Sequence, residues 1–335
     1  MRSFLVPILL LGVLVQRPLA AADERVERRL VALGTWLELE LGAVDRATAL
    51  AASGAAVRAI EAVEARLSTW RDDSELARLN RQPVGEPLAL SPELSGWLQR
   101  ARGWCERTGG TFDPSVGALV SLWGLRAGGV AEAPDDAALG EARAGLGRWS
   151  TAEGYATRLD ARVVFEEGAF GKGAALEAGL EAARAAGAHD ARIDLGGQLA
   201  FLGRAASVDV AHPDRRDEVV ATLRRAGGSF ATTGNSERGI VVAGVPLAHV
   251  LDPRTGCPAP DWGSLTVWAP RALDADALST ALYVLGPARA VRWADENTDV
   301  EVLALERTDD GSLLHHASRA FVRALNPSTP NPPVR

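Results

Sequence analysis

Lysine is almost absent from this sequence of 335 residues. Lysine and arginine together number 36, and only residue 172 is lysine, so the other 35 are arginines. Lysine carries a compact point charge, whereas arginine carries a broad planar fork of donors. The single lysine therefore marks Lys172 as a candidate site residue. The alternative is a solvated lysine at an ordinary glycine-rich helix start.

Cysteine is also scarce, with Cys105 and Cys257 the only two. A chain of this size with so few cysteines is not a disulfide scaffold. Two free thiols are the simpler expectation, and one bridge between them is the alternative.

The chain also has no net positive charge, because acidic residues outnumber basic ones. The net charge is −7 and the isoelectric point is about 5.4. No stripe of basic residues stands out, and binding to nucleic acid phosphates requires one. Nucleic acid is therefore excluded as the main partner. Hydrophobic residues make up 47% of the chain and charged residues 24%, which predicts a packed core.

An apolar run stands near the N-terminus, and after Val15 no apolar run is long enough to span a membrane. Arg2 precedes a run of 12 apolar residues, 4–15, which is shorter than the roughly 20 that a membrane helix needs. Small residues, Ala20 to Ala22, then precede Asp23. This pattern predicts a signal peptide over residues 1–22 and export to a periplasm. An uncleaved N-terminal anchor is the alternative.

The rest of the chain mixes helical and strand patterns without strict alternation, which predicts an α+β fold. We treat residues 23–325 as one domain and expect the proline-rich tail, 326–335, to be disordered. Ser91-Pro92 is typical of a helix start, and Asp274 is expected to cap a later helix. The expected helices cover 55–67, a segment from residue 92 to Gly109-Gly110, 171–188 and 274–286. The expected strands are a short one within 161–168 that runs into a loop, two within 191–203 joined by a glycine turn, one over 264–270 and one over 300–305.

The segment around the lysine reads GAFGKGA, which only partly resembles a phosphate-binding loop. Two residues, not four, separate the first glycine from Gly171-Lys172, and Gly173 follows where a P-loop has serine or threonine. The physical ingredients of an anion site remain, because small residues allow close approach and a helix N-terminus follows.

The segment LDADALSTALYVLG, residues 273–286, holds a candidate metal site. Asp276 and Thr280 are four residues apart, so a helix places them on one face. A carboxylate and a hydroxyl suit Mg²⁺ or Ca²⁺, which take oxygen ligands. The alternative is a solvated polar face opposite a core face of leucines.

A histidine precedes a turn in LAHVLDPRTGCPAP, residues 247–260. His249 ends an apolar run just before the turn residues Asp252-Pro253. A lone histidine is usually structural, but this one is in a histidine-poor chain and is a candidate for proton transfer.

Eight segments taken in order, from about Ala32 to Leu305, resemble the FAD:protein FMN transferase (ApbE) family. They are LGT (33–35), LSTWRDDSELARLN (67–80), GGTFDPSVGALVSLWG (109–124), EEGAFGKGAALEAG (166–179), IDLGGQLAFLG (193–203), FATTGNSERG (230–239), HVLDPRTGCP (249–258) and DADALSTALYVLG (274–286).

The resemblance implies a single large domain with a mixed or antiparallel sheet packed by helices. It also implies an enzyme that binds FAD and Mg²⁺ and transfers FMN to a threonine or serine hydroxyl of an exported protein, which releases AMP. If the acceptor protein lies at a membrane, such an enzyme would work close to that membrane. The alternatives are an FAD pyrophosphatase, which yields FMN and AMP, and a non-catalytic periplasmic FAD-binding protein.

The resemblance also implies roles for particular residues. His249 is the implied base for the incoming hydroxyl. The metal would be held by the backbone carbonyl of Ala169 and the side chains of Asp276 and Thr280. The implied flavin-contacting residues are Leu33, Trp70, Thr111, Phe112, Asp113, Glu166 and Lys172.

The chain departs from the family pattern near the implied cofactor. Leu33 replaces a common methionine of similar volume. Glu166 and Glu177 each replace a shorter aspartate, Gly171 replaces an alanine, and Ala174 replaces a tyrosine.

Overall fold

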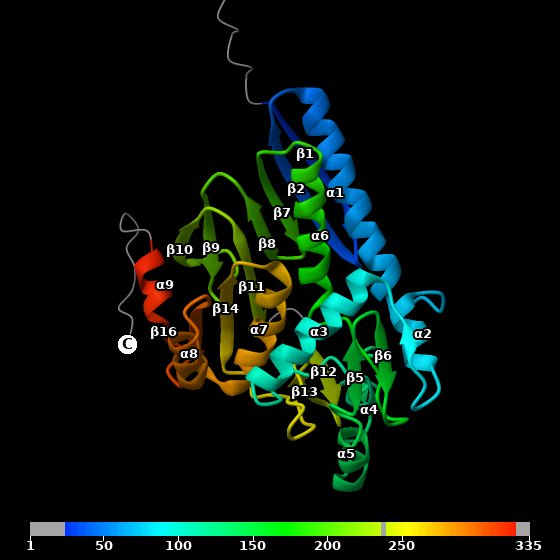
Figure 1. Cartoon of the computed structure of the whole chain (residues 1–335). Helices are drawn as coiled ribbons and strands as arrows, with labels where there is room; N and C mark the ends of the chain where they lie inside the picture. Colours follow the sequence, from blue (N-terminus) through cyan, green and yellow to red (C-terminus); the bar gives the residue numbers. More distant parts are fainter. Residues whose placement is uncertain (1–23, 236–238, 326–335) are drawn as a thin grey trace, which may run out of the picture.

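A large antiparallel sheet runs through the protein (Figure 1). The computed structural model describes residues 24–235 and 239–325. The expected signal peptide, 1–22, and the expected tail, 326–335, lie outside the described residues. In spatial order the strands are β1 (Glu24–Ala32), β2 (Thr35–Ala43), β7 (Asp190–Leu195), β8 (Gln198–Leu202), β11 (Gly228–Gly234), β14 (Gly263–Ala269), β15 (Glu301–Arg307) and β16 (Leu313–Ala317).

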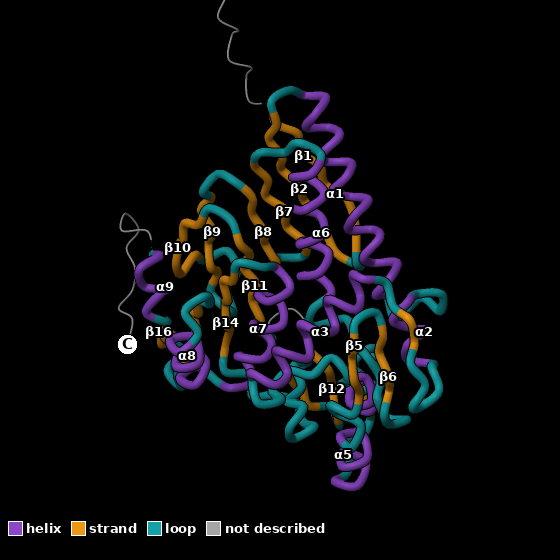
Figure 2. The backbone as a smooth tube through the Cα atoms, in the orientation of Figure 1, coloured by secondary structure: helices purple, strands orange, loops and turns teal. Residues whose placement is uncertain are grey.

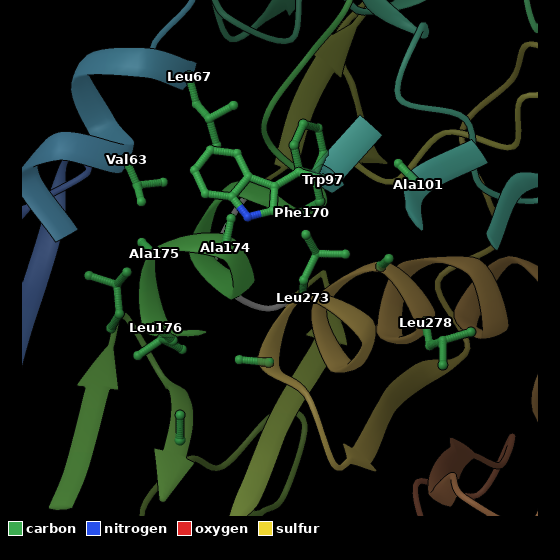
Figure 3. Packing of buried hydrophobic residues seen from close by; sticks show 14 of the residues in the cluster. Val63, Leu67, Trp97, Ala101, Phe170, Ala174, Ala175, Leu176, Leu273 and Leu278 are labelled. Atoms are coloured by element: carbon green, nitrogen blue, oxygen red, sulfur yellow. The ribbon is translucent and has the colours of Figure 1, made fainter. Parts of the chain in front are cut away.

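Helices α1 (Arg46–Leu67), α6 (Gly171–Ala185) and α7 (Ala272–Leu285) pack on one face of this sheet (Figure 2). α3 (Pro92–Arg107) contacts α7, and α8 (Pro287–Glu296) follows α7. The main hydrophobic core lies between these helices and the sheet. Figure 3 shows Phe170 and Trp97 filling the space between Leu67, Ala174 and Leu273. Ala174, where the family pattern has tyrosine, is fully buried in this core.

A second core covers the opposite face of the sheet. Along β15, Val302 and Ala304 belong to the main core, whereas Leu303 and Leu305 belong to the second one. This alternation is the two-residue period of a strand that is buried on both faces. The second core is covered by the hairpin β9 (Ala206–Ala211) and β10 (Val219–Arg225) and by α9 (Arg319–Ala324).

Two small sheets and three short helices lie beside the helical face. One sheet joins β3 (Leu88–Ala89), β6 (Tyr155–Arg158) and β5 (Trp149–Ala152). The other joins β13 (Val245–Ala248), β12 (Gly239–Val242) and β4 (Gly129–Val130). The helices are α2 (Glu75–Arg81), α4 (Gly117–Leu122) and α5 (Asp136–Arg143). None of the helices within the described ranges is long and apolar enough to cross a membrane.

Most of the elements predicted from sequence are present, and the α+β fold is confirmed. The Ser91 hydroxyl accepts a hydrogen bond from the Leu94 N–H and caps α3, with Pro92 in its first turn. One face of that helix is apolar and buried, and consists of Leu94, Trp97, Leu98, Ala101 and Trp104. Cys105 and Cys257 are both free, as the simpler expectation had it.

The predicted strand over 161–168 is wrong. Within this segment only Val164 forms a bridge, an isolated one to Val116. The backbone of Phe165 bonds a side chain, because Asn80 Nδ2 donates to its carbonyl at 2.9 Å and its N–H donates to Asn80 Oδ1 at 2.7 Å. Val163 and Phe165 are buried alternately like strand residues, but no neighbouring strand among the described residues pairs with them.

One expectation about α7 and one alternative interpretation of it are also wrong. Asp274 does not cap the helix: it lies inside the first turn, where it accepts hydrogen bonds from Arg100 at 2.8 Å and from the Trp104 indole at 2.7 Å. The solvated polar face is contradicted too, because Asp276 is 5% exposed and Tyr283 is fully buried. α6, β11 and β14 all pack against α7 and cover it.

Candidate functional site

The segment 166–173, which leads into α6, holds several of the predicted site segments together. The Glu166 N–H donates to the carbonyl of Pro114 at 2.8 Å, which ties the segment to the loop before α4. The Glu167 carboxylate accepts from the Thr69 hydroxyl at 2.7 Å and from the Thr69 N–H at 3.4 Å. Segments that are far apart in sequence therefore meet at the start of α6.

The start of α6 also meets α7. The Gly173 N–H donates to Oδ2 of Asp276 at 2.8 Å. A Cβ atom at residue 173 would lie 2.4 Å from the Ala272 carbonyl oxygen and 2.6 Å from the Leu273 Cα. Contacts this short involve backbone atoms that cannot move aside, so the approach of the two helices requires glycine at this position.

Asp276 is a buried carboxylate in an unusual electrostatic environment. Burial raises its pKa above the ordinary value, while the Lys172 ammonium and the Gly173 N–H oppose that rise. A carboxylate that has lost its water is stabilised by a nearby cation. Lys172 is half-buried in the first turn of α6, beside the positive end of the helix dipole. This corner therefore places the carboxyl group of Asp276 close enough to the Lys172 ammonium for the two charges to interact.

The three implied metal ligands are a carboxylate, a hydroxyl and a carbonyl oxygen, and oxygen ligands of this kind fit a hard metal ion. The Gly173 N–H is in the first turn of α6, where an N–H has no acceptor within the helix, and the Asp276 carboxylate is its partner. Ala169, whose carbonyl is the third implied ligand, is half-buried and lies just before the start of α6. Thr280 lies one turn further along α7 and is half-buried. Residues 24–235 and 239–325 contain no cluster of three or more His, Cys, Asp or Glu side chains suited to a metal. Magnesium commonly binds one or two carboxylates and completes its shell with water and substrate phosphates.

Trp70 and Glu166 are joined by Arg126, which sequence reasoning missed. The Arg126 guanidinium lies over the Trp70 ring, 4.6 Å from its centroid, and its Nη2 is 2.5 Å from Glu166 Oε2. The same nitrogen also donates to the Thr69 hydroxyl. Burial raises the pKa of Glu166, and the bond from Arg126 opposes that shift. No local pattern around residue 126 indicates these partners, since they come from two distant segments.

Leu33 occupies a strained turn. The β1–β2 hairpin pairs Ala32 with Thr35, so Leu33 and Gly34 form a two-residue loop with φ of +48° and +70°. Such a loop needs positive φ at both positions, and a bulky residue there is an outlier that is often functional. A Cβ atom at Gly196 would lie 2.7 Å from the Thr35 side chain, so the β7–β8 turn packs against this loop.

The side chains of Thr111, Phe112 and Asp113 face the interior. All three are buried. The Asp113 carboxylate accepts from the Ser115 N–H at 2.8 Å and from the Ser115 hydroxyl at 2.6 Å, which closes a local turn. The structure thus gives Asp113 a turn-forming role, in addition to the implied flavin contact.

His249 follows β13 and is half-buried. The turn after it is fixed on two sides. The Trp123 indole donates to the Gly256 carbonyl at 2.7 Å, which attaches the turn to the end of α4. The Tyr283 hydroxyl donates to the Pro260 carbonyl at 3.2 Å, which attaches the same stretch to α7, the helix of Asp276 and Thr280.

The predicted segments form one connected cluster. Thr233 donates to Ser279 at 2.9 Å, which links the segment 230–239 to α7, although residues 236–238 of that segment lie outside the described part of the chain. Gln198 donates to the Ala272 carbonyl at 3.0 Å, which links the β7–β8 turn to the same helix. Glu177 serves the framework, because it pairs with Arg100 at 2.6 Å.

Comparison with known proteins gives a consistent result. The profile of the ApbE family matches residues 33–304. An FAD:protein FMN transferase from Treponema pallidum is 34% identical over 71% of this chain and 72% of its own length. One from Rhodobacter capsulatus is 32% identical over 94% of this chain and 62% of its own length. The crystal structure of the ApbE protein of Thermotoga maritima superposes with a TM-score of 0.80 at 25% identity, over 90% of this chain and all of that one.

Proposed function

The chain belongs to the ApbE family, and on that premise we propose that it transfers FMN from FAD to a threonine or serine hydroxyl of another protein, with Mg²⁺. Its relatives carry the name FAD:protein FMN transferase. The observation that carries the proposal furthest is the corner where the Gly173 N–H holds the buried Asp276 carboxylate beside Lys172. That corner offers a cation site and an anion site to one pyrophosphate.

The residues of this corner have distinct tasks in the proposed reaction. Asp276, Thr280 and the Ala169 carbonyl would hold Mg²⁺, which when bound neutralises phosphate oxygens and orients them. Lys172 and the N-terminus of α6 bind phosphate oxygens of FAD. Trp70, Glu166 and the Leu33 turn bind the flavin half.

The proposed chemical step is a phosphoryl substitution. The acceptor hydroxyl oxygen bonds to the phosphorus of the FMN half, and the bond from that phosphorus to the bridging oxygen breaks. AMP leaves with the bridging oxygen, and the hydroxyl proton passes to His249 as general base. The products are AMP and a protein-linked phosphoester of FMN.

The cellular setting is part of the proposal. We propose that residues 1–22 are a cleaved signal peptide, that residues 23–325 are the transferase domain, and that the acceptor is an exported protein. The observations behind the signal peptide are Arg2, the short apolar run and the small residues before Asp23.

One assay tests the proposal against its alternatives. The purified protein is incubated with FAD, Mg²⁺ and an exported flavoprotein domain that offers a threonine. In-gel flavin fluorescence on the acceptor, with AMP released in equal amount, is the expected result. AMP release without acceptor would indicate a pyrophosphatase instead, and bound FAD with neither product would indicate a storage protein.

A further inference from the structure

A single guanidinium touches three side chains of the flavin side of the site. Arg126 follows α4, and its Cζ lies 4.6 Å from the centre of the Trp70 ring. Its Nη2 is 2.5 Å from Glu166 Oε2 and also bonds the Thr69 hydroxyl. Thr69 is in turn held by Glu167, so the group is anchored to the segment that leads into α6.

Trp70 is covered on one side only. Its side chain belongs to the loop between α1 and α2 and is 73% exposed even though Arg126 lies over one face. The opposite face of the indole is therefore open to solvent. An exposed tryptophan on a loop has several rotamers, and a guanidinium fixed by two further bonds favours the one it stacks on.

Glu166 depends on the same guanidinium. Its side chain is 15% exposed, and Arg126 is the cation paired with it. Removing Arg126 would leave this carboxylate without its counter-charge and free to turn away. Arg126 thus fixes both a stacking surface and a hydrogen-bond acceptor.

We propose that Arg126 is a positioning residue for the flavin ring, which stacks on the open face of Trp70 while the guanidinium supports the other face. This inference rests on the proposed function, since it takes Trp70 and Glu166 as flavin contacts. Arg126 would then affect the binding of the flavin ring and not the binding of the phosphates.

Three probes distinguish binding of the flavin ring from binding of the phosphates. Dissociation constants are measured for riboflavin, which has no phosphate, for FAD, and for ADP, which has no flavin. Arg126→Ala should weaken riboflavin and FAD by about tenfold each and leave ADP unchanged. Arg126→Lys keeps the charge but loses the planar fork, so its loss should be intermediate.

Arg29→Ala is the matched control. Arg29 lies over the Trp36 ring at 4.4 Å, and Trp36 is 55% exposed, so the variant removes a similar contact on the β1–β2 hairpin. Its affinities should equal those of the wild type. Unfolding temperatures of all variants show whether each one folds.

Two outcomes would overturn the inference. Weaker ADP binding with unchanged riboflavin binding would mean that Arg126 serves the phosphates. An equal loss for all three probes with a lowered unfolding temperature would mean that it serves only the fold. A wild-type protein that binds neither riboflavin nor FAD would instead contradict the proposed function itself, and this inference with it.

Discussion

The backbone nitrogen of Gly173 lies 2.8 Å from Oδ2 of Asp276. This bond gives an N–H in the first turn of α6 a carboxylate on α7 as its partner, and both residues are buried. α6 offers a first-turn N–H that has no acceptor within the helix, and α7 offers a carboxyl group that is buried away from water. The proposed metal and phosphate sites meet at this junction.

Asp276→Asn should make the metal-free protein more stable at neutral pH. The folded-state pKa of Asp276 is raised above its ordinary value of 3.8 by burial, so the folded protein keeps a proton that the unfolded chain has lost. The stability contribution of this group therefore falls as pH rises from about 4 through the folded pKa. Asparagine still accepts from Gly173 and carries no charge. The unfolding temperatures of the wild type and of Asp276→Asn should therefore agree at low pH and differ increasingly as the pH rises from about 4.

The same variant should lose its response to Mg²⁺. Magnesium should raise the unfolding temperature of the wild type at pH 7 and leave that of Asp276→Asn unchanged. Asp274→Asn is the control, because Asp274 is on the same helix but pairs with Arg100. For the preceding prediction, the contradicting result is a metal-free Asp276→Asn protein that is less stable than the wild type at neutral pH.

Gly173→Ala should destabilise the fold by about 1–3 kcal/mol, since its Cβ would overlap the backbone of α7. Gly96→Ala is a sharp comparison, because Gly96 lies within α3 and a Cβ added there would meet no described atom within 4 Å. That change should stabilise by about 0.5–1 kcal/mol through helix propensity. Urea unfolding measures both, and equal effects would rule out the close approach of α6 and α7.

Lys172→Arg should lower kcat/KM for FAD about tenfold or more, although it keeps the charge. The residue is half-buried between Gly171 and Gly173, both of which are buried, so a broader head group has little room. Arg184→Lys, at the exposed end of the same helix, should be neutral. A fully active Lys172→Arg would mean that the lone lysine is an accident of composition.

His249→Ala should reduce kcat for transfer by about 100-fold or more while the dissociation constant for FAD stays within about twofold, as expected for a general base. Stopped-flow transfer and equilibrium FAD titration measure the two quantities. His189→Ala, at the exposed end of β7 beside Asp190, serves as control. Equal losses of rate and affinity would remove His249 as the base.

Features that depend on local sequence were predicted well. Ser91 and Pro92 specify the start of α3 through a cap and a fixed φ, and Gly196-Gly197 specifies the turn between β7 and β8 through positive φ. The spacing of Asp276 and Thr280 on α7 follows from helical geometry alone. The eight short segments indicate the family through their order along the chain, which no single segment provides.

Features that depend on distant partners were not predictable. The strand expected over 161–168 failed because Asn80, 85 residues away, takes the hydrogen bonds of Phe165. Asp274 is no cap because Arg100 and Trp104 bind it across the interface with α3. Arg126 was missed because Glu166 and Thr69 are 40 and 57 residues away. In each case packing between elements decides which partner a polar group takes.

The most direct test measures flavin transferred to an acceptor domain by wild type and by Asp276→Asn, with Mg²⁺ and with a chelator. Mass spectrometry reports FMN on the acceptor, and chromatography reports AMP. We predict equal amounts of AMP and flavinylated acceptor for the wild type with Mg²⁺, and neither product for the variant or after chelation. Equal incorporation by Asp276→Asn, or by the wild type without divalent metal, would contradict a metal-dependent transfer at Asp276.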